Sequence, residues 1–130
     1  MKTKAIHRGS YVLLGCLWGC SGIHTHRPNG EEIVMSQDEF TKYAEDVFRH
    51  HNQVMAELID ADSDRSELDS DESKKLKTAE KQMVSSCQPL NDIVAEEMSG
   101  EQVGIDLKLD VIDAVPACEA ATLKVEDLIP

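Results

Sequence analysis

The chain has 130 residues, with 25 acidic and 13 basic side chains and a formal net charge of −12. A surface this acidic repels nucleic-acid phosphates and anionic lipid headgroups, so nucleic acid is excluded as an expected partner. The length allows one small domain, and burial of apolar surface gives such a domain only a modest margin of stability.

Residues 1–19 have the three parts of a secretory signal peptide, which are a basic start, an apolar run and a small residue at the cut. The basic residues are Lys2, Lys4 and Arg8, and Gly19 is the small residue before Cys20. The apolar run is far shorter than the ~20 residues that a membrane-spanning helix needs. A buried N-terminal helix is disfavoured because the segment holds several glycines, each of which costs a helix ~1 kcal/mol relative to alanine. We therefore expect a signal peptide that is cleaved.

The segment Leu17-Trp18-Gly19-Cys20 resembles the lipobox of bacterial lipoprotein precursors. The resemblance implies that a peptidase cuts before Cys20 and that its thiol carries a diacylglycerol, with a further acyl chain such as palmitate. Trp18 stands where that family prefers a small residue. Cys16 is a rival site, but it would leave only about five apolar residues, below the usual 7–15. The resemblance implies a lipid-anchored, periplasm-facing protein of the cell envelope, and plain secretion is the alternative.

Ser21 follows Cys20 directly. In the lipoprotein family an aspartate at this place is associated with retention in the inner membrane, so the resemblance favours the outer membrane. Cleavage before Cys20 removes three basic residues and no acidic one, which takes the formal charge from −12 to −15.

Once Cys20 is acylated, the remaining cysteines of the mature chain are Cys87 and Cys118. Two leftover cysteines in an oxidising compartment predict one disulfide bond. No other cysteine lies near either of them in the sequence, so the spacing of a zinc finger is absent.

Residues 20–34 contain little to bury and several turn formers, including Pro28, Asn29 and Gly30. This composition predicts a flexible tether between the lipid and the domain. His24 and His26 lie within it and together offer a weak metal site, because two imidazoles on a mobile strand are poorly preorganised.

Residues 36–60 predict a long amphipathic helix. Ser36 and Glu39 have the spacing of a capping box, and apolar side chains then recur every three or four residues. His50 and His51 are adjacent, so only one of them can approach the core, and neither has a catalytic partner at recognisable spacing.

The acidic bend at residues 60–72 resembles the start of an EF-hand calcium loop through Asp60, Asp62 and Asp64. The resemblance fails at Arg65, which occupies the place where the sharp turn needs glycine, and at Asp71, where the loop needs a bidentate glutamate. We expect no specific calcium site here, and a solvated connection in which Ser66 or Ser70 caps the next helix.

A second amphipathic helix follows the bend, with Pro89 inside its pattern and Ser99-Gly100 at its end. Pro89 predicts a kink or a restart, because proline lacks the N–H that the helix needs. Residues 103–111 alternate apolar and polar side chains without interruption, a strand signal that finds no second strand. We expect an extended segment across the helices or a distorted helical start, and then a third helix capped by Asp113 with Pro116 in its first turn.

The sequence therefore predicts an all-α fold, a helical hairpin closed by a C-terminal third helix. Its expected divisions are a signal peptide at 1–19, a tether at 20–34 and a helical domain at 35–130. No catalytic motif, cofactor site or metal ligand set is assigned, so no enzymatic activity is expected. The leading hypothesis is a structural or interaction role in the envelope, through the membrane anchor and a protein partner. The alternative is a periplasmic cation-binding module that uses residues 60–72 or His24 and His26.

Overall fold

The computed structural model describes residues 22–61 and 68–130. Three helices and one antiparallel two-stranded sheet make up this part of the chain, which confirms the expected all-α domain. The helices are α1 (Gln37–Asp60), α2 (Ser70–Ser99) and α3 (Ile105–Glu126), and the strands are β1 (Ile23–His26) and β2 (Glu32–Met35). The lipobox and the central residues 62–67 of the acidic bend lie outside the described residues.

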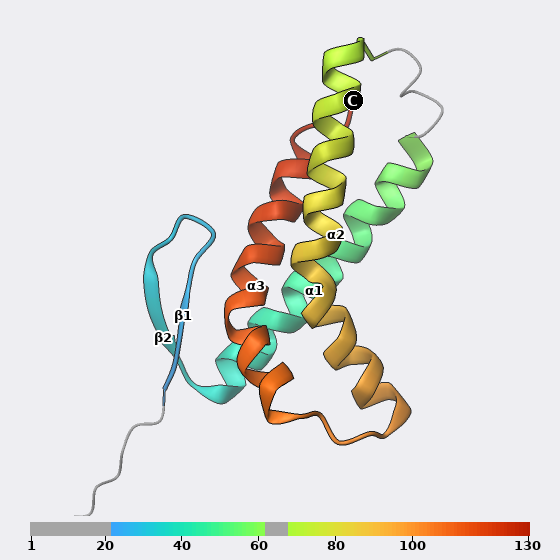
Figure 1. The fold of residues 1–130 in the computed structure, drawn as a ribbon. Coiled ribbons are helices and arrows are strands. Elements are labelled where there is room, and N and C mark those ends of the chain that lie inside the picture. Colours follow the sequence, from blue (N-terminus) through green and yellow to red (C-terminus); the bar gives the residue numbers. More distant parts are fainter. Residues whose placement is uncertain (1–21, 62–67) are drawn as a thin grey trace, which may run out of the picture.

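The three helices bury one apolar core. The contacts are most extensive between α2 and α3, and α1 packs against both (Figure 1). The fully buried side chains include Val54 of α1, Met83 of α2 and Val115 of α3. The core is almost entirely aliphatic, with Phe40 as its buried aromatic ring among the described residues.

Helix α1 begins as the sequence predicts. Ser36 is its N-cap, and the Ser36 hydroxyl accepts a hydrogen bond from the backbone N–H of Glu39, while the Glu39 carboxylate accepts one from the N–H of Ser36. Two backbone donors that the first turn leaves free are thus satisfied. The reciprocal bonds hold the pKa of Glu39 below its usual value.

The prediction of Ser66 or Ser70 as the cap of α2 is wrong. Asp69 is the N-cap, and its carboxylate accepts hydrogen bonds from the N–H groups of Asp71 and Glu72. These bonds lower the pKa of Asp69. A carboxylate is favoured over a hydroxyl here because the helix dipole also stabilises its charge.

Helix α2 ends at the residue that the sequence indicates and continues through its proline. Gly100 is the C-cap at φ 75°, a left-handed conformation that glycine adopts without steric cost. Pro89 lies inside α2 with no restart of the helix. Pro89 removes the backbone bond to the carbonyl of Ser85, which lies on the exposed side of the helix.

Residues 105–111 belong to α3, so the extended segment expected there is wrong and the alternative of a helical start is correct, although the helix begins at Ile105 and not after Asp113. The N-cap is Gly104, and Pro116 lies well inside the helix. An alternating pattern also places apolar residues four apart, and α3 uses that spacing. Leu107 and Val111 face the core, while Ile105 and Leu109 are exposed. Backbone bonds within the helix replace the strand partner that the segment lacks.

The segment expected to be a flexible tether instead forms a β-hairpin from residue 23 to residue 35. Ile23 pairs with Met35 and His26 with Glu32, and Gly30 takes a positive φ of 85° in the turn. The hairpin stands beside α3 (Figure 1). Its apolar residues Ile23 and Met35 are partly buried against the core.

Thr25 explains why the hairpin docks at this place. Pro116 has no N–H, so the carbonyl of Ile112, four residues earlier in α3, loses its usual helical donor. The hydroxyl of Thr25 donates to this carbonyl at 2.7 Å. Thr25 is 1% exposed, so the bond is shielded from water. The hairpin thus supplies the donor that the proline removes from the helix.

Candidate functional site

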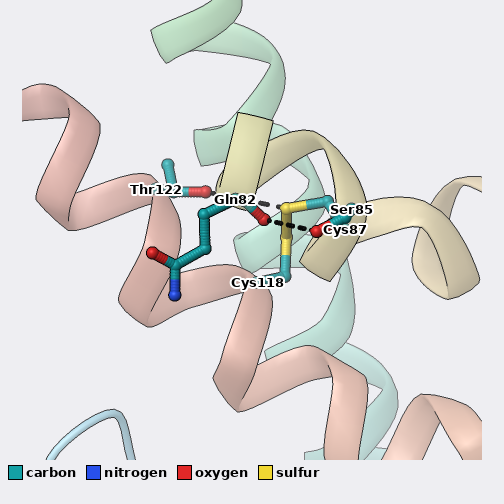
Figure 2. The surroundings of a disulfide bond; sticks show 5 residues. All are labelled: Gln82, Ser85, Cys87, Cys118 and Thr122. Carbon is teal, nitrogen blue, oxygen red and sulfur yellow. Dashed lines mark hydrogen bonds between the residues drawn. A yellow bond between two sulfur atoms is a disulfide. The ribbon is translucent and has the colours of Figure 1, made fainter. Parts of the chain in front are cut away.

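The predicted disulfide is present and joins the two most closely packed helices. Cys87 of α2 and Cys118 of α3 are bonded, with their Cα atoms 4.6 Å apart, and neither residue has exposed surface. Figure 2 shows the bond between the two helices, with Thr122 of α3 beside it. The hydroxyl oxygen of Thr122 lies 3.9 Å from Sγ of Cys87. Thr122 is also fully buried.

His51 of α1 completes this buried cluster. The side chain is 4% exposed, and one of its ring nitrogens and the two cysteine sulfurs all lie within 4.8 Å of one another. Nδ1 of His51 has no hydrogen-bond partner among the described residues. A buried nitrogen without a partner is costly, since removal from water is not compensated.

Burial lowers the pKa of His51, and the neighbouring His50 lowers it further. The imidazole is therefore neutral at physiological pH, with one nitrogen that offers a lone pair. A neutral ring is also the form that an apolar core can accommodate, because no charge has to be buried.

The burial of the cluster limits its chemistry. Thiol–disulfide exchange with another protein needs access of a thiolate to a sulfur. Cys87 and Cys118 are both sealed by the packing of α2 and α3, and His51 covers them from α1. In its oxidised state the cluster is a structural crosslink.

A second set of polar contacts joins α1 to α3 closer to the surface. The hydroxyl of Tyr43 donates a short hydrogen bond to the carboxylate of Glu119. Burial and the carboxylate both raise the pKa of Tyr43 well above its ordinary value. Nε2 of His50 lies 3.1 Å from a carboxylate oxygen of Glu126. Both pairs link α1 to α3, while His51 lies on the buried face of α1.

His24 and His26 lie on one exposed face of β1, because residues two apart in a strand point the same way. Nε2 of His26 is 3.9 Å from the carboxylate of Glu32 on β2. Over residues 22–61 and 68–130, the set of three or more potential metal ligands within reach of one ion is His51, Cys87 and Cys118, and the two strand histidines are not part of it. The aspartates at 62 and 64 lie outside the described residues.

The sequence identified two members of the cluster and missed the third. Cysteine counting predicts the pairing of Cys87 with Cys118. His51 is 36 positions before Cys87, and no spacing rule links them. One sequence signal could have identified His51. Adjacent side chains on a helix point in different directions, so only one of the two histidines can face the core, and His51 follows the buried Val47 by four residues, which places both on the same face.

Comparisons with known proteins place the chain in no family: no family model, curated protein or solved structure matches it. In the described part of the chain, none of the helices has both the length and the apolar character required to cross a bilayer.

Proposed function

We propose that the protein is a lipoprotein of the cell envelope, anchored through a lipid on Cys20, with a structural or interaction role at the membrane surface. The observation that carries the proposal is a basic start and an apolar run followed by Leu17-Trp18-Gly19-Cys20. The disulfide in the core supports it independently, because such bonds persist in oxidising compartments outside the cytoplasm.

The position of the hairpin supports a close approach to the membrane. Strand β1 begins at Ile23, three residues after Cys20. Three residues span at most about 11 Å, so an anchor at Cys20 would hold the hairpin close to the bilayer surface. The acidic surface of the domain keeps it from lying flat on anionic headgroups.

The sealed cluster supports a non-catalytic role. His51, Cys87 and Cys118 are the potential metal ligands that the described chain groups together, and they are at most 4% exposed. A substrate cannot reach them without separation of α1 from the other helices. An interaction role uses the exposed helix faces instead, where side chains such as Ile59 and Met98 stand free of the core.

The anchor is tested through Trp18, the single tryptophan of the chain. Cleavage before Cys20 removes it, so membrane-extracted protein should show tyrosine emission alone. Cleavage before Cys16 would leave the indole band, and so would an uncut precursor. Cys20→Ser should release the domain or leave the precursor uncut, because stable anchoring needs the acyl chains. Cys16→Ser is the matched control and should be processed like the wild type.

The alternatives give different results. A tryptophan-free protein in the soluble periplasmic fraction would identify plain secretion and refute the lipid anchor. A Cys20→Ser variant that is processed and partitions like the wild type would do the same.

The interaction role is tested by photocrosslinking in intact envelopes, with a crosslinking residue placed at Ile59 or Met98. A discrete adduct that disappears in Cys20→Ser supports a membrane-dependent partner. The same residue is placed at the exposed Leu109 of α3, and if positions on all three helices give no adduct, the interaction role is wrong.

A further inference from the structure

The cluster of His51, Cys87 and Cys118 has the composition of a metal-binding site. Zinc is held in proteins by cysteine thiolates and by histidine nitrogens, usually in a tetrahedron. In such a tetrahedron the ligand atoms are about 3.5–3.8 Å apart, as Zn–S bonds of about 2.3 Å and Zn–N bonds of about 2.0 Å require. A ring nitrogen of His51 and the two bonded sulfurs all lie within 4.8 Å of one another, so once the disulfide is reduced, rotations that move the sulfurs apart can bring all three ligand atoms onto one ion.

The unpartnered nitrogen of His51 is a second observation that indicates a ligand. The side chain is 96% buried, yet its Nδ1 has no hydrogen-bond partner among the described residues. Most buried polar groups in proteins are satisfied, so an unpartnered nitrogen on an imidazole that lies beside two cysteines calls for an explanation.

The combined charge of the three ligands favours a divalent ion. Two thiolates and a neutral imidazole carry a charge of −2, which a divalent cation cancels. A monovalent ion such as Cu⁺ would leave a net charge in a site without exposed surface, and an uncompensated buried charge is expensive. The buried hydroxyl of Thr122 lies beside Cys87 and adds a neutral oxygen at the edge of the site.

We propose that His51, Cys87 and Cys118 form a buried Zn²⁺ site when the disulfide is reduced. When the helices separate far enough to admit it, a dithiol reductant gives two electrons and two protons to the disulfide, which becomes two thiols, while the reductant becomes a disulfide. Zn²⁺ then binds both sulfurs as thiolates together with the neutral imidazole of His51, and two protons are released. The metal-bound and disulfide states exclude each other, so bound zinc protects the two sulfurs from oxidation.

This site is independent of the anchor and of the proposed envelope role. It concerns the chain before its disulfide closes, or after a reductant has opened it. In either state the metal crosslinks α1 to α2 and α3, whereas the disulfide joins only α2 and α3.

The test uses the full chain with Cys16→Ser and Cys20→Ser, so that Cys87 and Cys118 are its only thiols. The protein is reduced with a phosphine under anaerobic conditions and titrated with Co²⁺, which reports thiolate ligation through a charge-transfer band. Zn²⁺ is then added to displace Co²⁺ and to give the affinity in competition with a chromophoric chelator. We expect one ion per chain, bleaching of the band by Zn²⁺, and no binding to the oxidised protein.

The matched variants are His51→Leu and His50→Gln, two neighbours on α1. His51→Leu should lower zinc affinity at least about tenfold, since even partners outside the ligand shell contribute that much. His50→Gln should leave the affinity unchanged, because His50 faces Glu126. Helix content by circular dichroism is recorded for every sample. A reduced chain that regains helix on addition of Zn²⁺ also supports the site, because metal binding then drives folding.

Four results would overturn the proposal. One is a folded, reduced wild type that binds neither Co²⁺ nor Zn²⁺, and another is a reduced chain that stays unfolded with Zn²⁺. Equal affinity in His51→Leu would show that histidine is not a ligand. Binding of Cu⁺ without binding of Co²⁺ or Zn²⁺ would show that the assigned ion is wrong.

Discussion

The hydrogen bond from Thr25 to the carbonyl of Ile112 makes a prediction that a double-mutant cycle can test. Thr25→Val keeps the size and β-branching of the side chain but removes the donor. The 2.7 Å bond is then lost, and Pro116 cannot supply a replacement from within α3. Loss of a partner from a buried group costs about 1–3 kcal/mol, and we expect a decrease of about 2 kcal/mol in the free energy of unfolding.

Pro116→Ala changes that cost. The new backbone N–H at position 116 can donate to the carbonyl of Ile112, as in an ordinary helix. Thr25→Val in the Pro116→Ala background should therefore cost less than about 1 kcal/mol, because the carbonyl keeps a donor. The expected coupling between the two positions is about 1–2 kcal/mol, within the range found for residues that share a partner.

Urea unfolding of the oxidised protein, followed by far-ultraviolet circular dichroism, measures all four free energies of the cycle. Thr25→Ser is the control, because it keeps the hydroxyl and should lose less than Thr25→Val. Additive effects, with a coupling below about 0.5 kcal/mol, would refute the inference that the hairpin satisfies the carbonyl left by Pro116.

Two further predictions concern the buried cluster. Removal of the disulfide with Cys87→Ala and Cys118→Ala should destabilise the fold by about 3.7 kcal/mol at 25 °C on the chain-entropy account of its separation of 31 residues. Urea unfolding measures the loss, and a change below about 1 kcal/mol would contradict that account. The lowered pKa of His51 means that the unfolded chain binds the proton more tightly, so stability is complete above pH 6.5 and declines as the pH falls toward the folded pKa. The extra slope should not exceed about 1.4 kcal/mol per pH unit. Melting curves between pH 8 and pH 5 should show this slope in the wild type and in His50→Gln but not in His51→Leu, and a slope shared by all three proteins would assign it to other groups.

The sequence by itself determined those features whose signals are local. Helix α1 follows from Ser36, Glu39 and an uninterrupted three-four spacing, because a capping box and an apolar stripe act within one element. The end of α2 follows from Gly100, whose left-handed conformation is a property of the residue. The disulfide follows from counting, since two cysteines remain once Cys20 is assigned to the lipid.

The conformations of two elements depend on contacts with distant parts of the chain, which a local sequence pattern does not reveal. A two-stranded hairpin is only marginally stable in isolation, so the sequence of residues 23–35 by itself resembles that of a tether. The hairpin is stabilised because α3 provides a surface for it and an unpaired carbonyl for Thr25. Residues 105–111 alternate as a strand does, yet the positions of Leu107 and Val111 also suit a helix that packs on α2. Packing selects the helix because it satisfies the backbone without a partner strand.

The cluster around the disulfide was likewise predictable in part from the sequence and in part only from the tertiary structure. The sequence names Cys87 and Cys118, but the approach of His51 depends on how the buried face of α1 packs against α2 and α3. Side chains 31 or more positions apart are brought within reach of one ion only when three helices share a core. Tertiary packing therefore decided the candidate metal site, because it alone sets distances between residues on separate elements.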